Sequence, residues 1–268
     1  MVFPQGILTG AGGQLHSANA SGKGLASQQR ILSFCRNYWK YLQSHDVISI
    51  DLDPFHGVLN VSKAKRKGKT GEPSNMPYAP ADVIKIWKAA KERRYGKGKD
   101  APPDLQLLNL IKLAAYTGAR IEELCSLKVS DVTENSLRIT DSKTIAGIRE
   151  VPIHSALADL VASLVKHSDD GYLVSGLTFN KYQDRSNAVG KRFGRLKTDL
   201  GFGPDHTFHS WRSTVVTLLE NAGVGENLAA DIVGHEKPRI TYGLYSGGAS
   251  LEVKREALEK VHYPEPLE

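Results

Sequence analysis

Apolar residues recur along most of this chain with the three-to-four-residue period of amphipathic helices. The first such stretch, Ser27 to Ser44, repeats apolar side chains on one side. Leu105 to Ala115 is apolar almost all round, which predicts a buried helix. The remaining helical patterns cover 80–94, a short stretch opening at Arg120, 156–165, 187–200, 208–221, 226–233 and 251–261.

The period changes to two in the middle of the chain. Between Ser136 and Ile153, apolar and polar residues alternate on both sides of a turn at Ala146–Gly147, which predicts a β-hairpin. No series of alternating strands and helices occurs, so a Rossmann-type domain is excluded. We therefore predict a mainly α fold with a small antiparallel β-sheet, of the α+β class.

The composition divides the chain into two parts joined by a basic segment. Residues 1–60 combine a flexible stretch rich in Gly, Ala and Ser with the first predicted helix. Residues 61–77 form a linker, because Lys63 to Lys69 places five positive charges in seven positions and such a run stays extended. Residues 78–268 hold the other predicted elements and form the second domain.

The positive net charge of +6 is concentrated around that linker. The 268 residues hold 35 Lys and Arg against 29 Asp and Glu, whereas Val61 to Lys99 alone holds twelve basic and three acidic residues. A concentrated basic segment favours a polyanionic partner, and the alternative is a solvated linker. A hydrophobic content of 40% supplies a core and excludes bulk disorder.

Several kinds of site and location are excluded by the sequence. The two cysteines form no CxxC pair, so neither a disulfide framework nor a Cys-based zinc site is expected. His206 and His209 lie three apart but no third ligand clusters with them, so no metal site is predicted. No signal-peptide pattern and no apolar stretch of about 18 residues occurs, which predicts a cytoplasmic protein without membrane contact.

A set of cations followed by a tyrosine provides the candidate chemistry. Each member has an ordinary explanation when taken alone: Arg120 pairs with Glu122 or Glu123, and His209 is a satisfied core histidine. His209 and Arg212, however, lie three apart and therefore share a helix face. In chain order the set is Arg120, Lys143, His209, Arg212, His235 and Tyr245.

These residues lie in five short motifs. The motifs read Thr117-Gly-Ala-Arg120-Ile-Glu-Glu123-Leu, Ser142-Lys143-Thr-Ile-Ala-Gly147-Ile-Arg149-Glu-Val-Pro152-Ile, His209-Ser-Trp-Arg212, Gly234-His235-Glu and Thr241-Tyr-Gly-Leu-Tyr245-Ser. In this order and at these distances they resemble the motifs of the tyrosine recombinases, the phage-integrase family. The resemblance extends from Tyr78 to Tyr263 and implies the catalytic domain of that family.

The resemblance implies that Tyr245 cuts a DNA strand and leaves a 3′-phosphotyrosyl link with a free 5′-hydroxyl. Arginine suits this reaction because its planar guanidinium binds two phosphate oxygens in parallel, so Arg120 and Arg212 would hold the phosphate. Tyr242 is the competing nucleophile. It follows His235 by seven residues, whereas Tyr245 follows by ten, and the family's interval is nine or ten.

The same resemblance assigns the proton transfers. His209 would accept the phenolic proton, His235 would hydrogen-bond the phosphate, and Lys143 would protonate the departing 5′-oxygen. Glu123 would orient the cluster, and its alternative role is a helix-start carboxylate favoured by the helix dipole. Because the phosphotyrosine stores the bond energy, neither a metal nor another cofactor is expected.

The partner implied is double-stranded DNA with attachment sites, bound by a homotetramer in the cytoplasm, on the nucleoid. DNA-bending or excisionase proteins would assist. Basic side chains that contact phosphate supply affinity without sequence information. The residues assigned to such contacts are Lys63, Lys65, Arg66, Lys67, Lys69, Lys191, Arg192 and Arg195. Helix 251–261 either docks on a neighbouring subunit or packs on its own core.

We therefore predict a site-specific recombinase, the integrase of a phage or mobile element. The alternatives are a DNA relaxer similar to type IB topoisomerases, which uses the same cleavage, and a catalytically inactive DNA-binding relic. The family carries a larger helical, SAM-like core-binding domain before the linker. Residues 1–60 are expected to be a remnant of that domain. Either the chain is a fragment, which we favour, or the domain is reduced.

Overall fold

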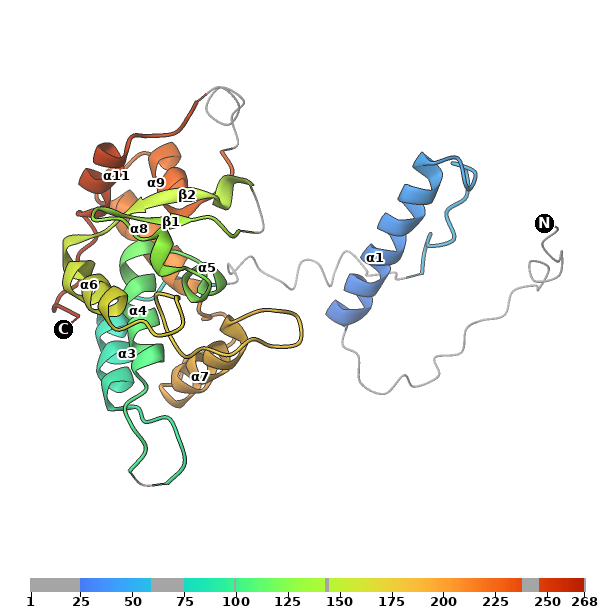
Figure 1. Cartoon of the computed structure of the whole chain (residues 1–268). Coiled ribbons are helices and arrows are strands. Elements are labelled where there is room, and N and C mark those ends of the chain that lie inside the picture. The colour runs from blue at the N-terminus through green and yellow to red at the C-terminus, as the bar shows by residue number, and fades with distance from the viewer. Residues whose placement is uncertain (1–24, 59–74, 99, 143–144, 238–245, 268) are drawn as a thin grey trace. The chain divides into compact units, whose positions relative to one another are not determined.

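The structure is a computed structural model that describes residues 25–58, 75–98, 100–142, 145–237 and 246–267. It divides the chain into two compact units, residues 1–71 and 72–268, and each is described by itself (Figure 1). Among the described residues, no helix has the length and apolar character needed to cross a membrane. Helices with one small antiparallel sheet confirm the predicted fold class.

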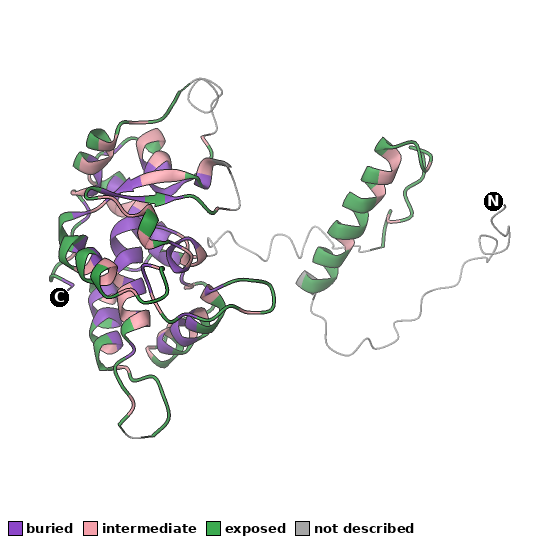
Figure 2. Ribbon diagram, viewed as in Figure 1, coloured by how far each residue is buried: buried purple, intermediate pink, exposed green. Residues whose placement is uncertain are grey.

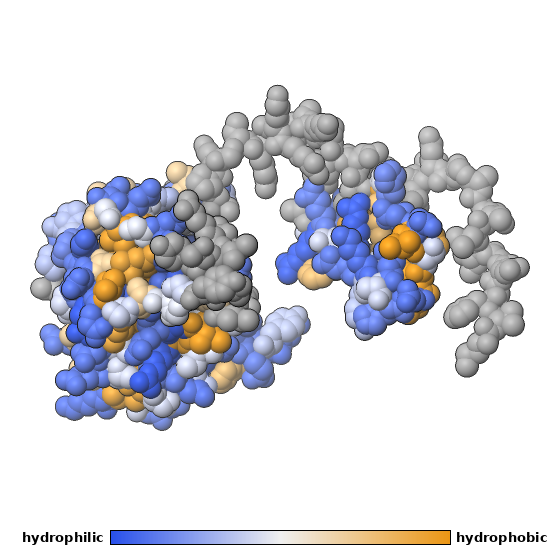
Figure 3. All heavy atoms as spheres, turned by 90° about the horizontal axis from the view of Figure 1, so that it is seen from above, coloured by the Kyte–Doolittle hydropathy of each residue, from blue (hydrophilic) through white to orange (hydrophobic). Residues whose placement is uncertain are grey.

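The first unit contains the predicted N-terminal helix, α1 (Leu25–Ser44). The chain after the helix folds back on it, and the indole of Trp39 donates to the carbonyl of Leu52 at 2.8 Å. This unit buries little of the helix, which is mostly green in Figure 2. Figure 3 shows hydrophobic atoms, in orange, at the surface of the same unit. Its large exposed side chains include Ile31, Phe34, Tyr38 and Tyr41.

The second unit contains the remaining elements, close to their predicted positions. The helices are α3 (Pro80–Glu92), α4 (Leu105–Thr117), α5 (Ile121–Cys125), α6 (Ala158–Lys166), α7 (Ser186–Asp199), α8 (Ser210–Asn221), α9 (Glu226–Val233) and α11 (Leu251–Leu258), and the strands are β1 (Ser136–Ile139) and β2 (Arg149–Pro152).

Helix α4 lies at the centre of the second unit. Leu107, Leu110, Ile111 and Leu113 are fully buried, as predicted for a buried helix, whereas Leu105 at its start is exposed (Figure 2). The helix packs against α3, α5, α7 and α8. Because the beginning of α5 directly follows the end of α4, this central helix positions Arg120.

The two strands form the predicted hairpin. They pair antiparallel with Leu137 opposite Val151 and Ile139 opposite Arg149, and a short 3₁₀-helix, Ile145–Gly147, precedes β2. Strand β2 also packs against α9 and α11. The sheet therefore connects the region of α9 to the loop that contains Lys143.

The C-terminal helix packs on its own unit. Leu258 in α11 and Val261 beyond it are fully buried, and the hydroxyl of Tyr263 donates to the carbonyl of Ala115 at 2.6 Å. Of the two arrangements predicted for this helix, the chain shows the contact with its own core.

Candidate active site

The turn between α4 and α5 positions Arg120. Helix α4 ends at Gly118, whose φ of 61° is left-handed and suits glycine. A Cβ at this glycine would lie 3.1 Å from Val233 Cγ1, so a side chain here would also crowd α9. Arg120 then caps α5, and its backbone N–H donates to Glu123 Oε2 at 2.9 Å.

The Glu123 carboxylate binds three guanidinium groups. Arg120 Nη1 lies 2.5 Å from Oε1, while Arg149 Nη2 and Arg212 Nη2 lie 3.1 Å and 3.4 Å from Oε2. The side chain of Glu123 is 3% exposed, and those of Arg149 and Arg212 are similarly buried. Glu123 therefore accepts a hydrogen bond from the helix start and also contacts all three arginines.

The electrostatics of this cluster favour an anion. Burial alone would raise the pKa of Glu123, but the charge of Arg149 and hydrogen bonds from Arg149 and Arg120 outweigh it and lower the pKa to about 2. The carboxylate is thus ionised at neutral pH. One negative charge faces three positive ones in a largely desolvated site, where charges interact more strongly than in water. A phosphate group would compensate the excess.

Arg212 has a donor available for such a ligand. Its Nε donates to the carbonyl of Gly118 at 2.7 Å, which fixes the plane of the guanidinium. Its Nη1 is buried and has no hydrogen-bond partner among the described residues. Because buried polar groups are generally paired, this donor is a candidate for a ligand oxygen.

Two histidines border the arginines. His209 precedes α8, and His235 follows α9 directly after Gly234, a left-handed residue with φ of 75°. Partial desolvation and the charges of Arg212 and Arg120 lower the pKa of His209 below its usual 6.5. The same causes lower the pKa of His235 to about 4. Both imidazoles are therefore neutral at pH 7 and able to accept a proton.

The loop that contains Lys143 begins at this cluster. Ser142 Oγ donates to Glu123 Oε1 at 3.1 Å, and a Cβ at Gly147 would overlap the Ser142 side chain. The predicted turn glycine is thus required for close packing. Some predicted site residues lie outside the described residues: Lys63, Lys65, Arg66, Lys67, Lys69, Lys143, Tyr242 and Tyr245.

Arg149 is a site residue to which the sequence assigned no role. Its Nε donates to Ile232 at 2.8 Å and its Nη1 to Gly147 at 2.7 Å, both on carbonyl oxygens. A signal was present in the hairpin pattern, because Arg149 shares the inward face with Val151. An arginine on a buried face needs partners, and Glu123 supplies the charged one.

Arg192, which the sequence assigned to phosphate contacts, is instead buried in α7. Its Nη1 donates to Asp104 Oδ1 at 2.7 Å and its guanidinium lies 4.0 Å from the centre of the Tyr95 ring, so it joins α7 to the start of α4. This burial removes Arg192 from the candidate phosphate contacts. Lys191 and Arg195 of the same helix are exposed.

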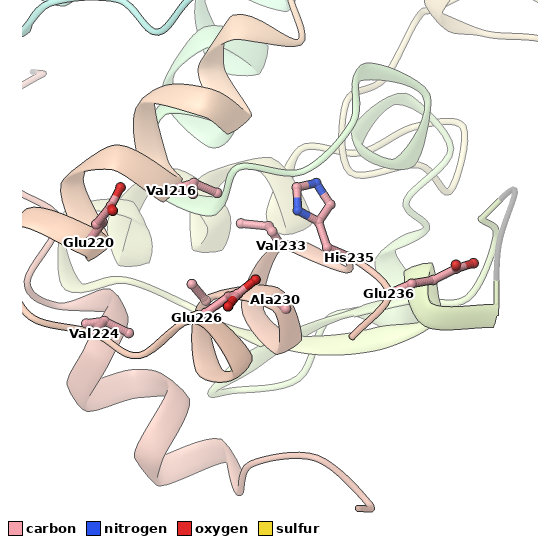
Figure 4. A pocket seen from close by; sticks show the side chains of 9 residues that line it. Val216, Glu220, Val224, Glu226, Ala230, Val233, His235 and Glu236 are labelled. Atoms are coloured by element: carbon pink, nitrogen blue, oxygen red, sulfur yellow. The ribbon is translucent and has the colours of Figure 1, made fainter. Parts of the chain in front are cut away.

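A cavity of about 530 Å³ lies beside His235. Figure 4 shows Val216 and Val233 on its lining, with the carboxylates of Glu220 and Glu226 nearby. Apolar walls and carboxylates do not suit a phosphate, so the cavity is chemically distinct from the arginine cluster.

Similar proteins add an independent comparison. The chain is 29% identical over 147 residues to the integrase of Escherichia phage HK022, covering 50% of this chain and 40% of that protein. It is 28% identical over 191 residues to the integrase of Escherichia phage lambda, covering 68% and 49%. The chain therefore spans about half the length of these curated relatives, or less.

Solved structures share the fold. A lambda integrase dimer bound to a COC′ core site superposes with a TM-score of 0.54 at 18% identity, covering 84% of this chain and 75% of that one. The Tn1549 transposon integrase in complex with circular intermediate DNA gives 0.54 at 21% identity, covering 90% and 81%. Residues 78–249 match the sequence model of the phage integrase family. The chain therefore belongs to the phage integrase family.

Proposed function

We propose that this protein is a site-specific DNA recombinase that cleaves and rejoins strands through a 3′-phosphotyrosyl intermediate. The observation that carries the proposal is the binding of Arg120, Arg149 and Arg212 to the single carboxylate of Glu123. Their excess positive charge and the buried Nη1 of Arg212 suit the oxygens of one phosphodiester. The family relationship supplies the reaction class.

In this proposal Arg120 and Arg212 bind the two non-bridging phosphate oxygens. The negative charge on these oxygens grows in the transition state, where preorganised donors stabilise it most. Removing one such donor typically costs about 3 to 4 kcal/mol, or roughly 10²- to 10³-fold in rate. The carboxylate of Glu123 keeps both guanidinium groups oriented before DNA binds.

Tyr245 is the proposed nucleophile. Its oxygen bonds to phosphorus while the bond to the 5′-oxygen breaks, and the phenolic proton moves to neutral His209. Lys143 protonates the departing 5′-oxygen, and His235 hydrogen-bonds the phosphate. Rejoining is the reverse reaction, in which a 5′-hydroxyl attacks the phosphotyrosine.

The proposed partner is double-stranded DNA with attachment sites of a phage or mobile element. Exposed Lys191 and Arg195 on α7 and the basic linker, Lys63 to Lys69, would contact phosphates. Residues 1–60 would be part of a helical core-binding domain. The active assembly would be a homotetramer, assisted by DNA-bending or excisionase proteins, acting on the nucleoid in the cytoplasm.

Nicked suicide duplexes of the candidate attachment site test this function. Cleavage next to the nick releases a short fragment that diffuses away, so a covalent protein–DNA adduct accumulates on a denaturing gel. We expect the adduct in the wild type and in Tyr242→Phe, and its loss in Tyr245→Phe. Absence of an adduct from the wild type, on sites it demonstrably binds, would refute the proposal.

A further inference from the structure

Both flanks of the segment that contains Tyr245 are bound to one carboxylate. Asp231 Oδ1 forms an ion pair with Lys237 Nζ at 2.6 Å. Asp231 Oδ2 accepts a hydrogen bond from the backbone N–H of Ala249 at 3.0 Å. Lys237 precedes the segment 238–245 and Ala249 follows it closely. Asp231 lies in α9, two residues before its end.

The entry to the segment is fixed in several ways. Helix α9 ends in the left-handed Gly234, whose N–H donates to Ala230 at 2.8 Å, and the N–H of His235 donates to the same carbonyl at 3.0 Å. Lys237 then turns back to Asp231, and its side chain is only 8% exposed. A buried ammonium group is costly without a partner, so the contact with Asp231 constrains this lysine strongly.

The exit from the segment is also fixed. Gly248 has φ of +88°, a left-handed conformation that suits glycine, and it lies against the carboxylate of Asp231. Ser250 caps α11 directly after Ala249. Lys254 in that helix donates to the carbonyl of Glu150 in β2 at 3.2 Å.

We propose that Asp231 is a positioning residue that holds both ends of the nucleophile segment, so that the tyrosine hydroxyl reaches the phosphate bound by the arginines. The inference rests on the proposed function and deepens it. Restraining both ends of a short segment reduces the conformations open to it. A displacement of about 1 Å in a reacting group is able to slow a reaction roughly 10²-fold.

The test compares variants of the full chain on the nicked suicide duplex. Asp231→Asn removes the charge that binds Lys237, and Lys237→Met removes only the entry contact. Asp199→Asn is the matched control, because it loses an exposed ion pair with Arg93 in a different part of the unit. The measurements are duplex affinity by gel shift, single-turnover adduct rate at saturating protein, and thermal unfolding by circular dichroism.

We expect Asp231→Asn and Lys237→Met to form the adduct about 10- to 100-fold more slowly, with unchanged affinity for the duplex. Since both act through one contact, the double variant is expected to be no slower than the slower single variant. Asp199→Asn is expected to retain the wild-type rate. If Asp231→Asn unfolds, Lys237→Met alone still decides the outcome.

A second substrate separates positioning of the nucleophile from protonation of the leaving group. With sulfur at the 5′-bridging position, the leaving thiolate needs no proton, so this duplex is expected to rescue Lys143→Ala but not Asp231→Asn. Rescue of Asp231→Asn, or its cleavage at the wild-type rate, would overturn the inference alone. A wild type that binds the duplex and forms no adduct would overturn the proposed function and the inference with it.

Discussion

The guanidinium of Arg149 donates to the Glu123 carboxylate at 3.1 Å, joining strand β2 to the start of α5 across 26 positions of the chain. The same guanidinium donates to the carbonyls of Gly147 and Ile232. Arg149 therefore links the loop of Lys143, the cap of Arg120 and the end of α9 that precedes His235. Three motifs that are far apart in the sequence share this side chain.

Replacing Arg149 should reduce both stability and cleavage. Arg149→Met leaves Glu123 buried with fewer partners, and breaking a buried ion pair in this way typically costs about 3 to 5 kcal/mol. Urea unfolding followed by circular dichroism measures the loss. Arg138→Met, on the exposed face of β1, is the matched control and should change stability by less than about 0.5 kcal/mol. Equal effects of the two substitutions would contradict the role of Arg149.

The ionisation of Glu123 predicts how stability depends on pH. Its pKa is about 2 in the folded protein against an ordinary 4.5. The unfolded chain binds more protons between these values, so stability rises with pH through this interval and is lost as pH falls. The contribution is on the order of 3 kcal/mol. Glu123→Gln should flatten this part of the pH profile of urea unfolding, and an unchanged slope would show that Glu123 is not responsible.

Gly234 combines a left-handed backbone with a close neighbour, so its substitution should be unusually damaging. A Cβ there would lie 2.6 Å from Arg149 Nη1. Gly223→Ala is the matched control, since its φ of +74° is nearly the same and no atom would lie within 4 Å. Both variants incur about 1 to 2 kcal/mol of backbone strain. Only Gly234→Ala should also displace Arg149 and slow adduct formation.

Most helices and the hairpin could be predicted from the sequence because residues close together in the chain determine where each element begins and ends. Helix α9 has the predicted bounds because Gly234 ends it, and the hairpin follows from alternation around Gly147. The site required contacts between distant segments. Glu122 and Glu123 look equivalent in sequence, yet Glu122 accepts hydrogen bonds from the backbone at the start of α7 while Glu123 binds the arginines.

Arg192 illustrates the same limit. Its charge favoured an exposed position on α7, but Asp104 and Gln106, 88 and 86 residues earlier in the sequence, meet it in the folded unit. No helical period contains that information. Arg149, by contrast, shared a face with buried Val151, so its burial was predictable although its partner was not.

The positions on α7 predict different effects for neighbouring basic residues. Arg192→Met should destabilise the protein without changing how DNA affinity depends on salt. Lys191→Met and Arg195→Met should leave stability unchanged, weaken binding, and reduce the slope of log affinity against log salt by about 0.9 for each lost phosphate contact. Gel shifts at several salt concentrations measure these slopes. A reduced slope in Arg192→Met at full stability would contradict its structural role.

The neutral state of His209 predicts a pH dependence that DNA itself alters. In its proposed role as proton acceptor, His209 must be unprotonated, so adduct formation should rise with pH. In the free protein the positive surroundings lower its pKa below 6.5, and cleavage measured at low DNA concentration reports this free form. A bound phosphate brings negative charge, which favours the imidazolium and raises the pKa. At saturating DNA, the acid limb of the pH profile, where the rate rises with pH, should therefore lie at higher pH than at low DNA.

His209→Gln, which cannot accept the proton, should lose this acid limb and cleave about 10²- to 10⁴-fold more slowly. Single-turnover rates measured between pH 4.5 and 8.5, at intervals of roughly 0.5 pH unit, locate the acid limb at low and at saturating DNA. An acid limb that lies at the same pH under both conditions, or that persists in His209→Gln, would assign the proton transfer to another group.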